Sequence, residues 1–206
     1  MDEAHRVREF WFGRLPLSAD ALNRRLHFWF AGPPSELGRL RDEHIRERFG
    51  ELLELAASGA LASWEDGPRR RLSLILLLDQ FPRNMFRGTA RAFAYDTGAL
   101  ALTLSGMQSG AEAALDPVER MFFYMPLQHA ESREAQDESV AAYRRLLAEA
   151  PQPLYGPFAA ASRSAENHRA IIERFGRFPH RNRVLGRENT PAEQEWLLKA
   201  RVSFGQ

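Results

Sequence analysis

Two short segments, "LLDQFPRN" at residues 77–84 and "RFGRFPHRN" at residues 174–182, concentrate side chains that could do chemistry. In each segment a Phe-Pro pair is followed by arginine and asparagine, and the second segment adds His180. Arginine presents a planar fork of donors that matches carboxylate and phosphate groups, and histidine exchanges protons near neutral pH. If the fold brings the two segments together, they predict an anion-binding site.

Positive charge is dense around the second segment. Between residues 163 and 187, seven arginines stand against two glutamates, an excess of five positive charges in a chain whose net charge is +1. Such a cluster favours a phosphate, a carboxylate or an acidic peptide segment as ligand. A solvated basic face is the alternative interpretation. The residues predicted to bind the ligand are Asp79, Arg83, Arg87, Arg177, His180, Arg181 and Asn182.

Asp79 follows five consecutive apolar residues, so we expect its carboxylate to be at least half buried and to need a partner. Because Pro82 disfavours the helical conformation for the residue before it, the helix that carries Asp79 is expected to end near Gln80. Arg83 and Arg87 are the local candidates for the partner, and a histidine or arginine of the second segment is the distant one. A purely structural ion pair that holds this corner is the alternative to a functional role.

The helix that leads into the second segment has an apolar face that includes a histidine. His168, Ile171, Ile172 and Phe175 recur at the spacing of one helix face, so His168 should point inward. An inward histidine is commonly a structural core residue. The donors that follow it in the sequence make a functional role the second interpretation.

A third candidate segment is "MPLQHAES", residues 125–132. His129 lies at helical spacing behind apolar residues, so it too can face the interior. Glu131 can meet the same site only if the chain leaves helical geometry here, in which case the two side chains form a general acid–base pair. The alternative is that Ser132 caps the next helix with Glu131 near its N-terminus. The candidate catalytic residues are therefore His129, Glu131 and His168.

The elements that must position these residues are all predicted to be helices, because Leu, Ala, Arg and Glu dominate and β-branched alternation is scarce. Helical patterns cover residues 3–12, a segment capped by Ser18 that runs to about residue 31, a long charged segment capped by Ser35, and residues 68–80, 91–110, 133–149 and 157–175. Two more helices begin at capping boxes, "DPVE" at 116–119 and "TPAE" at 190–193. We predict an all-α fold, one domain over residues 1–206, with consecutive helices packed as antiparallel pairs.

Composition narrows the function classes. There are no cysteines, which excludes disulfides, thiolate chemistry and cysteine-ligated metals. The net charge of +1 argues against a nucleic-acid binder, and the longest apolar run, "LILLL", is too short to cross a membrane. The charged N-terminus is no secretory signal, and we expect a cytoplasmic protein. No phosphate loop, HExxH or GxSxG motif occurs. A metal site of His129, His168, His180 and Asp79 is an alternative that their spacing does not support, so no cofactor and no metal site are predicted.

Three long motifs, "LLLDQFPRNMFRGT", "ERMFFYMPLQHAES" and "HRAIIERFGRFPHRNRVLGRENTPAEQEWL", resemble a bacterial family catalogued as domain of unknown function 924. The resemblance runs from about residue 10 to about residue 198. It implies an all-helical fold similar to tetratricopeptide repeats, that is, antiparallel helical hairpins in a right-handed array. It also implies, without assigning roles, that several residues occupy family-motif positions: Asp79, Arg83, His129, Glu131, His168, His180 and Arg181.

Two functional hypotheses follow from these residues. The first is a helical binding protein that holds an anionic small molecule or an acidic peptide end in a groove lined by arginine and histidine. The second is a small-molecule enzyme of the hydrolase type in the same pocket. In it, a histidine paired with Glu131 or Asp79 would exchange protons while Arg83 and Arg181 hold the substrate's anionic group.

Overall fold

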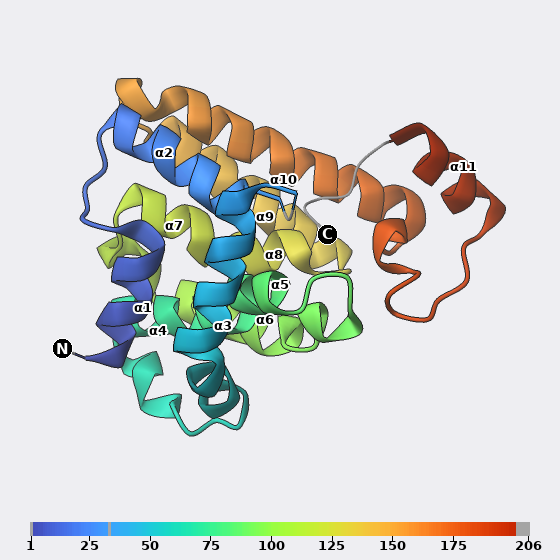
Figure 1. Ribbon diagram of the computed structural model, residues 1–206. Coiled ribbons are helices and arrows are strands. Elements are labelled where there is room, and N and C mark those ends of the chain that lie inside the picture. Colours follow the sequence, from blue (N-terminus) through green and yellow to red (C-terminus); the bar gives the residue numbers. More distant parts are fainter. Residues whose placement is uncertain (1, 33, 201–206) are drawn as a thin grey trace.

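The chain is helical throughout the part that the computed structural model describes, residues 2–32 and 34–200 (Figure 1). The α-helices are α1 Glu3–Phe12, α2 Ala19–Phe30, α3 Glu36–Ala57, α4 Pro68–Ile75, α5 Phe81–Met85, α6 Asp96–Gln108, α7 Pro117–Phe123, α8 Met125–His129, α9 Arg133–Ala148, α10 Tyr155–Phe175 and α11 Pro191–Ala200. The short helices between them are η1 Ala62–Asp66, η2 Leu76–Gln80, η3 Ala90–Phe93, η4 Ala111–Ala114, η5 Gln152–Leu154 and η6 Pro179–Arg181. The predicted all-α class is confirmed. Within the described ranges, no helix is both long and apolar enough to cross a bilayer.

Helix starts follow the capping signals closely. The hydroxyl groups of Ser18, Ser35 and Ser132 accept hydrogen bonds from the first turns of α2, α3 and α9. Asp116 and Glu119 form the reciprocal capping box at the start of α7. At α11, the Thr190 hydroxyl accepts from the Glu193 N–H at 3.2 Å, and the Glu193 carboxylate accepts from the Thr190 N–H at 2.7 Å.

The core is built around aromatic side chains from the first two helix ends. Trp29 packs edge-on to Phe122 with ring centroids 4.5 Å apart, and its indole N–H donates to the Trp11 carbonyl at 2.8 Å. α9 and α10 pack along each other and cover one side of this core (Figure 1). α11 lies apart, against the end of α10, where Trp196 contacts Phe175.

The expectation that the helix of Asp79 ends near Gln80 is wrong. The chain continues as one turn of π-helix over Leu76–Gln80 and then directly as α5, with Phe81 at φ −66° and ψ −40°. The Phe81 N–H donates to the carbonyl of Leu76, five residues back, instead of four. This wider turn changes the hydrogen-bond register just before Pro82, where an α-helix would set a carbonyl against the proline ring. The helix therefore continues through the proline.

The helix expected at 91–110 begins later, at Asp96, after the short helix η3. This difference matters because Asp96 lies in the first turn of α6, where a negative charge is favourable. α6 packs closely at Gly106. A methyl group there would lie 2.6 Å from Cζ of Phe123 and 2.8 Å from Cδ of Arg71.

We expect Gly106→Ala to lower the free energy of unfolding by about 1–3 kcal/mol, because the added methyl overpacks the contact of α6 with Phe123. Gly98→Ala in the same helix is the matched control. Its methyl would meet only Leu78 at 3.6 Å, so better helix propensity should stabilise the fold by about 0.5–1 kcal/mol. Urea denaturation measures both, and equal effects of the two substitutions would contradict this packing.

Candidate functional site

The two Phe-Pro segments meet at a carboxylate that neither of them contains. Arg83, from the first segment, donates from both terminal nitrogens to the two oxygens of Asp96 at 2.8 Å each. Arg181, from the second segment, approaches Asp96 Oδ2 with Nη1 at 3.4 Å. Both arginines are buried, with 8% and 6% of their surface exposed. The N-terminus of α6 thus holds guanidinium groups from distant parts of the chain side by side.

Asp79 is completely buried and is held from several directions. Its Oδ1 lies 2.6 Å from Nδ1 of His129 and 3.2 Å from Arg83 Nη1, and its Oδ2 accepts from the Gln80 amide. Arg83 also donates to the Asp79 carbonyl at 2.7 Å. Because an ionised carboxylate can only accept, the His129 proton lies on Nδ1, which leaves Nε2 as the acceptor of the neutral ring.

The charges of this group determine its protonation. Burial alone would raise the pKa of Asp79, but the positive charge of Arg83 and the hydrogen bond from His129 outweigh it and hold the pKa below its ordinary value. Burial and the nearby Arg83 charge lower the pKa of His129, despite the attraction of Asp79. We therefore assign an ionised Asp79 and a neutral His129 at pH 7.

The second segment contributes a stack of rings around Arg181. The guanidinium carbon lies 4.6 Å from the Phe93 ring centroid and 4.5 Å from that of Phe178, within cation–π distance of both rings. Phe178 also touches the rings of His168 and His180, with centroids 5.6 Å and 5.5 Å apart. His168, His180 and Arg181 thus all contact the ring of Phe178.

Burial and neighbouring positive charge lower the pKa of His168, His180 and Arg181. The pKa of His168 falls to about 4, and that of His180 to about 3 with Arg181 as the main charged cause after burial. Burial and the charge of Arg83 lower the pKa of Arg181 to about 10. At neutral pH the positive charge of the site therefore resides on arginine alone.

These side chains face a cavity of about 420 Å³ between α2, α5, α8 and α10. Its polar and charged lining consists of Gln80, Arg83, Asn84, Arg87, Gln128, His129, Ser164, His168, His180 and Arg181. Its apolar and aromatic lining consists of Leu26, Trp29, Phe30, Ala31, Phe93, Met121, Met125, Tyr143, Pro157, Ala160 and Ala161. Among the described residues that line it, none is Asp or Glu. The acidic partners lie behind the arginines, so the wall presents positive groups to the cavity.

The structure brings six of the sequence-predicted residues to this cavity, but Asp79 stands behind its wall, and Arg177, Asn182 and Glu131 lie elsewhere. Arg177 pairs with Glu193 of α11 at 2.7 Å, away from the cavity. Asn182 is fully buried and donates to Asn189 at 2.8 Å. Arg87 lines the cavity while it binds Asp42 at 2.6 Å.

Of the two interpretations of residues 125–132, the pairing of His129 with Glu131 is wrong. Glu131 accepts from the Phe178 N–H at 2.8 Å and from both terminal nitrogens of Arg187, at 2.6 and 2.9 Å. Ser132 caps α9, as the alternative interpretation had it. The chain turns out of helical geometry after His129, and this directs Glu131 toward the second segment while His129 faces Asp79.

Sequence reasoning missed Asp96, Phe93 and Gln128. The sequence pattern predicts Asp96 inside the helix expected at 91–110. In the structure Asp96 is the first residue of α6, and neither proline nor glycine at residues 93–95 signals the break before it. The side-chain Oε1 of Gln128 accepts from the Ser164 hydroxyl at 3.2 Å, which joins α8 to α10 at the cavity wall.

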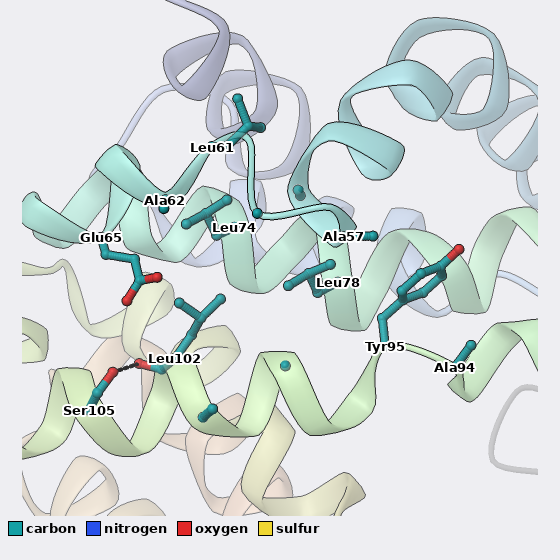
Figure 2. A pocket seen from close by; sticks show the side chains of 14 residues that line it. Ala57, Leu61, Ala62, Glu65, Leu74, Leu78, Ala94, Tyr95, Leu102 and Ser105 are labelled. Atoms are coloured by element: carbon teal, nitrogen blue, oxygen red, sulfur yellow. Dashed lines mark hydrogen bonds between the residues drawn. The ribbon is translucent and has the colours of Figure 1, made fainter.

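A second hollow, of about 520 Å³, lies between the α3–α4 connection and α6 (Figure 2). Its lining is mostly small or leucine side chains, with Glu65 near one end and Tyr95 near the other (Figure 2). Glu65 is the one charged residue in that lining as described. The larger hollow therefore lacks the convergent polar groups of the first cavity, and we take the first as the candidate site.

Comparison with known proteins is consistent with the fold. Residues 7–201 match the model of a family of bacterial proteins of unknown function, domain of unknown function 924. The chain belongs to this family. A solved structure of a protein of unknown function from Agrobacterium tumefaciens is 35% identical, with a TM-score of 0.78 over 95% of this chain and 96% of that one. No curated protein is significantly similar. Family membership thus supports the helical fold and assigns no activity to the cavity.

Replacing Arg83 by methionine should lower the free energy of unfolding by about 3–5 kcal/mol, because Asp79 and Asp96 lose their shared partner in a buried place. Arg169→Met is the control. Arg169 pairs with Asp137 at the surface, and its loss should cost less than about 1 kcal/mol. Chemical denaturation compares the two variants, and similar losses would show that Asp79 is stabilised without Arg83.

Proposed function

We propose that this protein binds an anionic small molecule, or the acidic end of a peptide, in the cavity between α2, α5, α8 and α10. The observation that carries the proposal is the convergence of Arg83 and Arg181 on Asp96 at a wall that has no acidic side chain of its own among the described residues. Arg181 shares Asp96 with Arg83 and approaches it at 3.4 Å, farther than the 2.8 Å of the Arg83 bonds, so a bound anion would lower the electrostatic cost of burying Arg181.

The geometry supports an anion for two further reasons. The groups are held in place before binding, by the stack of Phe93 and Phe178 on Arg181 and by the bidentate pair of Arg83, so little side-chain entropy is lost on binding. The cavity is partly shielded from water, and its volume lies in the range of small-molecule sites.

Arg181→Met should weaken the binding of small carboxylates and phosphates at least tenfold, because the fork that faces the cavity is lost while its volume is retained. Arg183→Met, two residues away and exposed, removes the same charge outside the cavity and should leave the affinity within twofold. A thermal-shift screen finds the anion, and titration calorimetry at fixed salt measures both variants. An anion that loses the same affinity in both variants does not use this cavity.

The second candidate function is an enzyme in the same cavity, favoured by the contact of His129 with Asp79. A buried carboxylate on Nδ1 orients the ring and stabilises the imidazolium that forms when Nε2 takes a proton. In a hydrolase, His129 would take the proton of a water molecule as the water attacks the carbonyl carbon. It would then give that proton to the leaving oxygen or nitrogen. Arg181 would hold the substrate's anionic group.

His129→Gln should abolish any hydrolysis found in a panel of small esters and amides that carry a carboxylate, whereas His27→Gln, at the surface, should not change it. Because the neutral ring is the base and its pKa is lowered, the rate should fall on acidification only below pH 6.5, the ordinary value. A pH–rate profile tests this. A rate that survives His129→Gln removes the enzyme candidate and leaves the binding proposal intact.

The proposal also keeps two expectations from the sequence. One is that the helices form antiparallel hairpins in a right-handed, tetratricopeptide-repeat-like array, which the close packing of α9 along α10 supports. The other is that the protein works in the cytoplasm, where small anionic metabolites are available.

A further inference from the structure

One face of α10 runs along the whole cavity and changes character on the way. Pro157, Ala160, Ala161, Ser164 and His168 all line it, and their spacing places them on one side of the helix. At 1.5 Å per residue this stripe is roughly 16 Å long. Its first part is apolar and partly open to solvent, with Ala160 exposed, and its last part is polar and buried at His168. The cavity therefore has an apolar mouth and a polar floor.

The elements that line the cavity opposite α10 also change from apolar at the mouth to polar at the floor. α2 lies against η5, which leads into α10, and supplies Leu26, Trp29 and Phe30 to the lining (Figure 1). Phe30 is 62% exposed, which places it at the mouth. At the other end, beside His168, lie the histidine and arginine of the second segment.

At the polar floor of the cavity, one N–H group of Arg181 lacks a hydrogen-bond acceptor among the described residues. Arg181 is 6% exposed, and its buried Nε has no hydrogen-bond partner within the described part of the chain. Its guanidinium approaches Asp96 at 3.4 Å, and the oxygens of Asp96 already accept two shorter bonds from Arg83. Arg181 lines the cavity, so a carboxylate there would give its guanidinium a closer partner than Asp96 does at 3.4 Å.

The charge of the surroundings suits a single negative charge. Arg83 and Arg181 are balanced by Asp79 and Asp96 while His129 is neutral. The remaining lining arginine, Arg87, shares Asp42 with Arg41, and Arg41 binds the Trp29 and Ala31 carbonyls at the end of α2. The surroundings of the cavity as a whole therefore carry one positive charge in excess. The two negative charges of a phosphate dianion would outnumber this one positive charge in a partly buried place, whereas the single charge of a carboxylate equals it.

We propose that the ligand is an elongated amphipathic monocarboxylate, a medium-chain or arylalkyl acid. Its carboxylate lies on Arg181, and its chain lies along Ala161 and Ala160 toward Trp29 and Phe30. This inference rests on the proposed anion-binding function and adds the class and orientation of the ligand to it.

Titration calorimetry with butanoate, hexanoate, octanoate and decanoate at pH 7.5 tests the orientation on the unaltered protein. Affinity should rise about fourfold for each added methylene until the chain reaches the mouth, because each one leaves water for the apolar wall. Octanol should bind at least tenfold more weakly than octanoate, because it lacks the charge that Arg181 meets. Octyl phosphate, as the dianion, should also bind more weakly than octanoate.

Two variants locate the chain and the head group. Ala161→Phe should lower octanoate affinity at least tenfold and leave butanoate within twofold, because the new ring fills the apolar part of the stripe. Ala170→Phe, on the exposed face of the same helix, is the matched control and should change neither. Arg181→Met should remove the preference for octanoate over octanol.

The outcomes separate this inference from the function on which it rests. If inorganic phosphate and butanoate bind as tightly as octanoate, and Arg181→Met still abolishes their binding, the cavity binds anions but the amphipathic class is wrong. Octanol binding as tight as that of octanoate would overturn the inference by showing an apolar site without a head-group contact. If no anion of the series binds through Arg181, both the inference and the proposed function fail.

Discussion

Asp79 carries its negative charge at a position without any contact with solvent, and the surrounding polar structure depends on satisfying it. A carboxylate in such a place is tolerated only with charged partners and hydrogen bonds close by. Arg83 supplies the charge, Gln80 an amide, and His129 an N–H from another helix. The π turn at Leu76–Gln80 lies at this point of the chain, and it keeps the helix continuous through Pro82. One buried ionised group therefore links α5 to α8.

Asp96 extends the same arrangement to the C-terminal part of the chain. It binds Arg83 through both oxygens and is approached by Arg181, so it joins the first and second Phe-Pro segments. Glu131 holds the second segment from its other side, through the Phe178 N–H and Arg187. The position of Arg181 is thus determined by groups from α6, α8–α9 and its own segment, which is the rigidity that a preorganised binding site needs.

The histidines of the cavity are kept neutral by the same burial and by the arginines near them. The site consequently combines fixed positive charge on guanidinium groups with imidazole rings that can accept protons. Fixed charge suits the holding of an anion, and a neutral imidazole oriented by Asp79 suits proton transfer. The two candidate functions use the same residues, and they differ in whether His129 changes its protonation state while the ligand is bound.

Local sequence determined the helices and most of their boundaries, because capping residues and apolar periodicity act within a few residues of each other. Ser18, Ser35 and Asp116 begin helices as their types predict, and His168 faces inward as its spacing predicts. Arginine and histidine are also dense at the two Phe-Pro segments, and Arg83, His180 and Arg181 of these segments line the cavity that we take as the candidate site.

Only the tertiary structure decided which charges meet. His129 pairs with Asp79 and not with Glu131, Arg177 turns to α11, and Asp96 becomes the common partner of Arg83 and Arg181. These pairings join residues far apart in the chain, and several of them depend on the π turn and on the late start of α6, which no local pattern signals. The direction of a side chain in a packed interior follows from the elements around it, and a one-dimensional spacing does not contain that information.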